Sequence, residues 1–286
     1  MTTLGRAYDR FFSERHRAAV EHVMVYLSIA GFAIHLLVVF FARTLANPAT
    51  WMTAAGSSYL AALYTPFSFI LFYEVLMLVW ALPESTTHSI AKQYEIVSLI
   101  FIRGVFKAIA DIQNISQIEK REAALPILTD MSAGLLMFLL VTVFKAVARK
   151  RSRLDVAHEQ STALQGYVAQ KKTVALALML VLLAIAVYHL WSLGLEGLRV
   201  FYPDLFTAMI FTDVLVLILS LLVSDRYELV FRNAAFIGST ILIRTSLTAS
   251  PPYSAPLALF SMVFGILTLL VYNYHSRLSA DHASKD

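Results

Sequence analysis

Long apolar stretches alternate with short polar ones along almost the whole chain. A transmembrane helix needs about 20 predominantly apolar residues to cross a hydrocarbon core about 30 Å thick. Eight stretches reach this length, so the pattern predicts an all-α polytopic membrane protein with eight transmembrane helices. The approximate ranges are 23–42, 62–82, 91–111, 126–147, 173–193, 205–223, 229–249 and 256–274.

The composition excludes several classes of protein. Of the 286 residues, 58% are hydrophobic and 15% are charged, whereas soluble domains have about 45–50% and about 25%. A soluble fold would have to expose the excess apolar surface. The net charge of +4 is too small to indicate nucleic acid as a partner. Because cysteine is absent, disulfides, thiolate metal sites and cysteine nucleophiles are excluded.

The lysines and arginines predict the orientation. With the N-terminus inside, the outer side holds only four of the 23, namely Arg43, Lys120, Arg121 and Arg199. Three more lie in the interior of predicted spans (Arg103, Lys107 and Arg244), and the other 16 lie on the inner side or at the inner ends of spans. Because cytoplasmic loops are enriched in cations, we expect both termini to be cytoplasmic.

The same pattern suggests a division of the chain into segments. We expect an amphipathic cytoplasmic leader, a first four-helix repeat, a basic cytoplasmic linker, a second repeat and a cytoplasmic tail. Their ranges are 1–22, 23–147, 148–172, 173–275 and 276–286. The lipid bilayer is the expected partner, and the basic linker could bind anionic lipids.

The repeat rests on matches that keep their order. FAIHLL in the first span matches AVYHLW in the fifth, FILFYEVLMLVWAL matches AMIFTDVLVLILSL, and LIFIRGVFKA matches TILIRTSLTA. The aligned pairs are His35 with His189, Glu74 with Asp213, and Arg103 with Arg244. Since four spans restore the starting side, both repeats have the same orientation, which predicts a pseudo-two-fold axis along the membrane normal.

The C-terminal half resembles a known family. FTDVLVLILSLLVSDRYELVFRNAAFIGSTILIRTSL followed by LALFSMVFGILTLLVYNY is similar to the phosphate-starvation-inducible PsiE family of small bacterial four-span membrane proteins. Asp213 and Arg244 take the positions of the family's carboxylate and arginine, and the first half matches through the repeat. The resemblance implies a location in the bacterial inner membrane. It does not indicate which biochemical activity the protein has.

The ionisable residues within the spans are the candidate functional residues. A charge near the bilayer centre costs about 2.5–3.5 kcal/mol on insertion scales. We expect Glu74 and Asp213 to pair with the arginine of the following helix or with its counterpart in the other repeat. Such pairs either fix helix packing or belong to an ion or proton pathway.

The third span is the most polar. Its spacing places Arg103, Lys107 and Asp111 along one helical face, with Glu95 two turns before Arg103. That face lines either a hydrated cavity or a polar seam against another helix, and Lys107 with Asp111 could form an intrahelical pair. We therefore include Lys107 and Asp111 among the candidate pathway residues.

His35 and His189 have three interpretations. They could be packed within the helix bundle, take part in a proton path, or supply both axial ligands of one haem. Apart from that haem alternative, the sequence indicates no cofactor or metal. No nucleotide-binding, zinc-protease or serine–histidine motif occurs, so we expect no enzyme activity and no catalytic residue.

Three hypotheses for the function remain. The main one is a transporter or channel for a small ion, or a proton-coupled transporter, with Glu74, Asp213 and their arginines around the pathway. The second is a non-transporting scaffold or regulatory subunit of the envelope stress response, and the third is a single-haem electron carrier. A homo-oligomer is possible for each of them.

Overall fold

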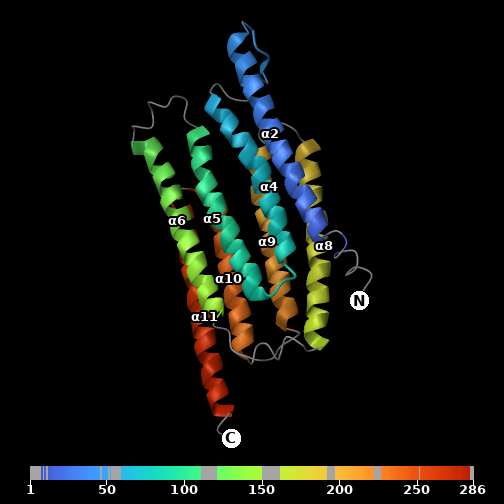
Figure 1. The fold of residues 1–286 in the computed structure, drawn as a ribbon, viewed down its shortest axis with the longest axis vertical. Helices are drawn as coiled ribbons and strands as arrows, with labels where there is room; N and C mark the ends of the chain where they lie inside the picture. The colour runs from blue at the N-terminus through green and yellow to red at the C-terminus, as the bar shows by residue number, and fades with distance from the viewer. Residues whose placement is uncertain are drawn as a thin grey trace. The chain divides into compact units, whose positions relative to one another are not determined.

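The computed structural model describes residues 8, 10, 12–45, 47–50, 52, 59–110, 121–149, 162–191, 197–221, 227–250 and 252–283. This part of the chain is helical and contains no strand. Figure 1 shows its long helices with one short 3₁₀ turn. In chain order they are α2 (Glu14–Thr44), the 3₁₀ turn η1 (Tyr59–Leu63), α4 (Tyr64–Ala81), α5 (Thr86–Ala110), α6 (Arg121–Arg149), α8 (Thr162–Trp191), α9 (Gly197–Leu221), α10 (Tyr227–Thr248) and α11 (Ser254–Ala283).

Each predicted apolar stretch coincides with one long helix, but several helices extend beyond it. Helix α2 begins at Glu14, where Ser13 caps it by accepting a hydrogen bond from the His16 backbone N–H. Helix α8 begins at Thr162 instead of residue 173, and α11 continues to Ala283. Hydropathy marks only the part of a helix that suits lipid, whereas the helix itself continues until the backbone is capped or interrupted.

Six of these helices are long and apolar enough to cross a membrane: α2, η1 with α4, α6, α8, α9 and α11. Helices α5 and α10 do not meet the same criterion, since they carry several charged and polar side chains. The helical class is therefore confirmed, and several helices have the length and composition to span a membrane. The count of eight spans stays a prediction.

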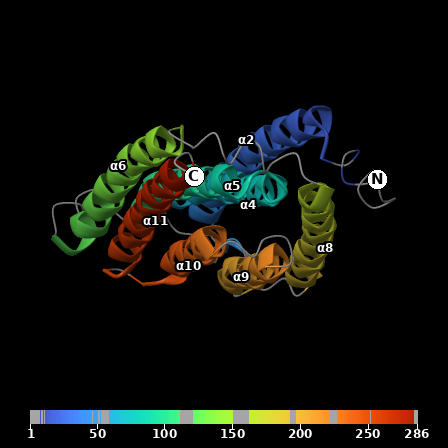
Figure 2. The same ribbon diagram turned by 90° about the horizontal axis from the view of Figure 1, so that it is seen from below.

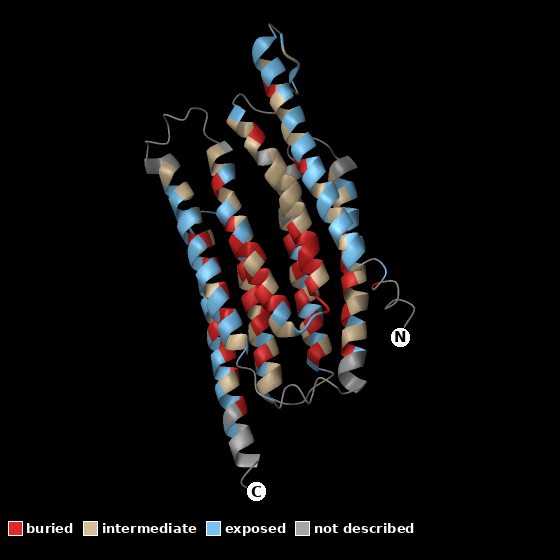
Figure 3. Ribbon diagram, viewed as in Figure 1, coloured by how far each residue is buried: buried red, intermediate tan, exposed pale blue. Residues whose placement is uncertain are grey.

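Apolar side chains are also exposed along several helices. In Figure 3 most of α2 is exposed, and this helix exposes Tyr26, Ile29, Ile34 and Leu37. Helices α6 and α8 likewise expose rows of leucine, valine and phenylalanine. Long helices satisfy their own backbone hydrogen bonds, and exposed apolar faces are compatible with lipid but costly in water. These are the features of an integral membrane protein.

The described chain divides into two compact units that interleave in sequence. The first comprises Met1–Arg10, Leu78–Val97 and Leu136–Asp286, and the second comprises Phe11–Met77 and Ser98–Leu135. Within the first unit, α8 packs on α9, α9 on α10, and α10 on α11, as both views show (Figures 1 and 2). The parallel repeat at 23–147 and 173–275 stays a prediction.

A hydroxyl network forms part of the core of the first unit. Tyr94 of α5 is fully buried, and its hydroxyl bonds to the Ser239 hydroxyl of α10. Ser239 and Ser261 of α11 bond to each other through their hydroxyls, 3.0 Å apart. Gly265 faces the same tyrosine, and a Cβ there would collide with the Tyr94 hydroxyl. Helices α5, α10 and α11 are thus held together by a buried polar contact as well as by apolar packing.

Candidate functional site

Asp213 of α9 and Arg244 of α10 form a buried ion pair in the first unit. Each side chain is 3% exposed, and Arg244 Nη2 lies 3.1 Å from Asp213 Oδ2. The same nitrogen donates to Asp213 Oδ1 and to Gln93 Oε1 of α5, at 3.3 Å each. Three helices therefore meet at one guanidinium nitrogen.

Arg244 has more donors than this arrangement uses. A guanidinium carries five N–H groups, one on Nε and two on each terminal nitrogen. Nε and Nη1 of Arg244 are buried and have no hydrogen-bond acceptor among the described residues. Asp213 Oδ2 likewise has no well-aligned hydrogen bond there, although it lies beside Nη2. Three N–H groups thus remain in an interior where unmade hydrogen bonds are costly.

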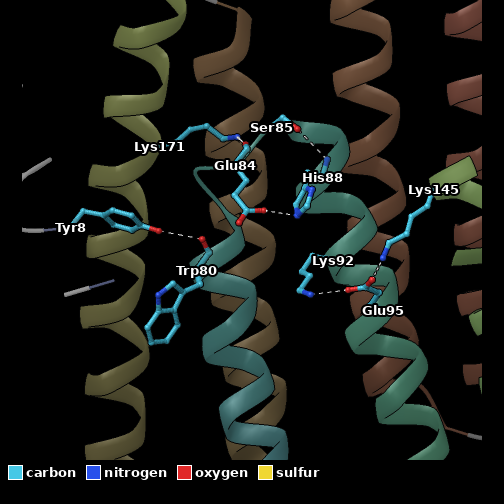
Figure 4. A network of polar contacts seen from close by, with 9 residues as sticks. All are labelled: Tyr8, Trp80, Glu84, Ser85, His88, Lys92, Glu95, Lys145 and Lys171. Carbon is cyan, nitrogen blue, oxygen red and sulfur yellow. Dashed lines mark hydrogen bonds and ion pairs between the residues drawn. The ribbon is translucent and has the colours of Figure 1, made fainter. Parts of the chain in front are cut away.

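Lys171 of α8 adds a second cation near this pair. Its side chain is buried, and its ammonium donates to the Glu84 backbone carbonyl at 2.7 Å. The ammonium also lies 5.3 Å from the centre of the Tyr167 ring and interacts electrostatically with the Asp213 carboxylate. Figure 4 shows the lysine reaching the chain turn after α4 that carries Glu84.

Glu74 of α4 and Arg103 of α5 form the corresponding pair in the second unit. Arg103 Nη1 contacts Glu74 Oε1, and the side chains are 23% and 6% exposed. The next residue, Gly104, has no side chain, which leaves room for the Asp130 carboxylate of α6. A Cβ at Gly104 would lie only 2.8 Å from Asp130 Oδ2.

The predicted pairing of each carboxylate with the arginine of the following helix is confirmed in both units. The contacts of the two histidines also correspond between the units. His35 of α2 bonds to the Thr65 hydroxyl of α4, and His189 Nε2 of α8 lies 3.0 Å from Asp204 Oδ2 of α9. Thr65 and Asp204 each stand nine positions before the carboxylate of their helix. The two units thus make corresponding contacts, which favours the predicted repeat.

The polar face predicted for the third span is only partly described. Arg103 pairs with Glu74, whereas Asp111 and the side chain of Lys107 lie outside the described part of the chain. Glu95 contacts both Lys145 of α6 and Lys92, the latter at 2.9 Å (Figure 4). Lys107 and Asp111 stay predictions.

Sequence reasoning missed four partners of the predicted residues: Gln93, Lys171, Thr65 and Asp204. The repeat register contained a signal for two of them, because Thr65 and Asp204 occupy aligned positions. Gln93 and Lys171 carry no such signal. The linker was expected to extend to residue 172, which placed Lys171 outside the predicted spans, whereas it lies in helix α8.

Among the described residues, no group of three or more histidine, aspartate or glutamate side chains is placed to hold a metal ion.

No protein-family model, curated protein or solved structure matches the chain.

Proposed function

We propose that this protein is a bacterial inner-membrane transporter or channel for a small ion, or a proton-coupled transporter. One observation carries the proposal: two buried carboxylates, Glu74 and Asp213, pair with arginines at corresponding positions, Arg103 and Arg244. The inner-membrane and bacterial parts rest on the resemblance to the PsiE family.

The energetics of buried charge support this proposal. Replacing a buried ion pair by apolar residues of similar volume is often neutral or stabilising. Helix packing alone therefore does not require ions in an apolar interior. Ionisable side chains inside membrane-spanning segments are typical of ion and proton pathways, where their charge interacts with the transported ion or proton. Two such pairs in corresponding contacts favour a shared role in transport.

A scaffold or regulatory subunit is the alternative function, and the burial of the second pair favours it. Asp213 and Arg244 are 3% exposed and in contact with each other, as expected of groups that only hold helices together. Under this alternative the pairs fix helix register, and the wild-type protein itself supports no flux.

Flux measurements with amide variants separate the two functions. Glu74→Gln and Asp213→Asn keep shape and hydrogen-bonding capacity but cannot bind and release a proton. In proteoliposomes we expect both variants to fold and to lose flux or its pH dependence. Glu84→Gln is the matched control, because the Glu84 carboxylate is half exposed and outside both pairs. Folded amide variants with undiminished flux would exclude both carboxylates as carriers, and a wild-type protein without flux would favour the scaffold.

A further inference from the structure

The buried charges of the first unit are unequal in sign. Its described buried ionisable side chains include three cations, Lys171, Arg232 and Arg244, but only one carboxylate, Asp213. Arg232 makes contacts with neutral groups, since it lies 4.5 Å from the centre of the Tyr272 ring and donates to Asn233. Arg244 and Lys171 are the two cations that interact with the Asp213 carboxylate.

Neighbouring groups do not remove this excess. Gln93 is neutral and contacts Arg244 through its carbonyl oxygen. The Glu84 carboxylate attracts Lys171 more strongly than Asp213 does, but it is 49% exposed, so solvent screens its charge, and Lys171 bonds to the Glu84 backbone instead. Arg244 Nε and Nη1, both buried, also lack an acceptor among the described residues. Positive charge and hydrogen-bond donors are thus in surplus at the same place.

We infer that this cluster binds a small monovalent inorganic anion of the size of a halide or nitrate. Arg244 Nε and Nη1 would donate to it, and Lys171 would balance its charge. A cation would meet two like charges, and a divalent anion would exceed the surplus of one. Since Arg244 and Asp213 are almost fully buried, a free ion fits better than a lipid headgroup. As a binding site this inference stands alone; as the transported substrate it rests on the proposed function.

Thermal unfolding tests the site. The full-length protein is purified in a neutral detergent and heated in bromide or nitrate, with gluconate replacing the anion at constant ionic strength. A ligand that binds only the folded state raises the melting temperature with its concentration. We expect a saturable rise with bromide and nitrate that is independent of the cation. If the melting temperature of the wild type does not rise with bromide or nitrate, or rises equally with gluconate, the inference is overturned.

Variants show which residues bind the anion that raises the melting temperature. Lys171→Met removes the surplus charge, and Arg244→Lys keeps the charge but removes the Nε and Nη1 donors. Each should raise the half-saturating bromide concentration by about tenfold or more. Lys172→Met is the matched control, because Lys172 is the neighbouring lysine and lies 5.7 Å from the centre of the Tyr8 ring instead. Equal responses in Lys171→Met and Lys172→Met would contradict the site.

Gln93→Glu gives a test that does not depend on weakening the fold. The change is nearly isosteric and places a carboxylate beside Arg244 Nη2. If the cluster has a surplus positive charge, this variant should melt at or above the wild-type temperature in gluconate and lose its response to bromide. A lower melting temperature with an unchanged bromide response would show that the cluster is already neutral, and would overturn the inference.

Two further measurements are needed. One distinguishes a free anion from a lipid headgroup, and the other distinguishes the binding site from the proposed transport function. Phosphatidylglycerol added to the detergent should leave the bromide response intact; if it abolishes the response competitively, the ligand is a headgroup. Bromide binding without any flux in proteoliposomes would leave the site standing and contradict the proposed function. Flux in proteoliposomes without any effect of bromide on the melting temperature would contradict the anion site and leave the proposed function standing.

Discussion

At the residue scale, the Asp213–Arg244 pair is the most consequential contact in the described chain. Both side chains are buried, so neither can recover hydration if its partner is removed. The cost of breaking such a pair is therefore much larger than its net contribution, because the remaining charge stays in an apolar interior. Glu74 with Arg103 is less enclosed on the arginine side, and its loss should cost less.

Arg244→Gln should lower the free energy of unfolding by about 3–5 kcal/mol, since the buried Asp213 carboxylate loses its contacting arginine and keeps only the electrostatic interaction with Lys171. The double change Asp213→Asn with Arg244→Gln should recover much of this loss, because both members of the ion pair are then uncharged. Arg149→Gln, at an exposed position at the end of α6, is the control. Denaturant unfolding in detergent measures all three. An Arg244→Gln variant within about 1 kcal/mol of the wild type would contradict the expected coupling.

These pairs could be predicted from the sequence because a charge in an apolar stretch needs an opposite charge within reach. The repeat left two candidates, the arginine of the following helix and its counterpart in the other repeat, and the structure shows the first. The additional partners could not be predicted in this way. Gln93 is uncharged and stands among other polar residues of α5, and Lys171 lies where a basic residue usually marks the membrane boundary. Only the packing of α8 against α9 brings Lys171 toward Asp213.

At the element scale, the arginines lie on the two long helices that do not meet the apolar criterion. Helix α5 carries Arg103 and helix α10 carries Arg244. Helix α10 packs on both α9 and α11, which bury Arg232, Ser239, Thr240 and Arg244. A helix of this composition can lie within a membrane only if neighbouring helices cover its polar side chains. Hydropathy could predict all eight apolar stretches, but it could not predict which neighbouring helices cover the polar side chains of these two.

The contact between Gly265 of α11 and Tyr94 of α5 makes a prediction for helix packing. Gly265→Ala should destabilise the protein by about 1–3 kcal/mol, because the new Cβ collides with the buried Tyr94 hydroxyl. In a Tyr94→Phe background the oxygen is gone, so the added cost of Gly265→Ala should fall. Gly238→Ala is the control, since a Cβ at Gly238 meets nothing within 4 Å. Thermal unfolding of the four variants and the wild type measures this coupling, and strictly additive changes would exclude it.

At the scale of the whole molecule, the corresponding contacts are the best support for duplication. A histidine of the first helix contacts the second helix nine positions before a carboxylate, and that carboxylate pairs with an arginine of the third helix. Unrelated halves would have no reason to place all of these contacts in one register. The compact units nevertheless interleave, with Leu78–Val97 in the same unit as the C-terminal part. Sequence similarity shows which residues correspond, but it does not determine which helices pack together.

The number of membrane crossings can be tested at the basic linker. If α5 and α10 cross the membrane, the chain has eight spans and residues 148–172 lie on the side of the N-terminus. If they do not, six spans remain, both termini still share one side, and the linker lies on the opposite side with its six lysines and arginines. Because cytoplasmic segments collect cations, the eight-span arrangement is expected.

A reporter that is fluorescent only in the cytoplasm should therefore be active at both termini and when inserted within residues 151–160. The same reporter inserted within 111–120 should be inactive, because eight spans place that segment outside and six place it inside. These two internal sites give opposite results for the two arrangements, whereas the termini alone give the same result for both. An inactive reporter in the linker together with an active one at 111–120 would show that α5 does not cross the membrane. If both termini were still active, α10 would not cross either, and the eight-span arrangement would be wrong.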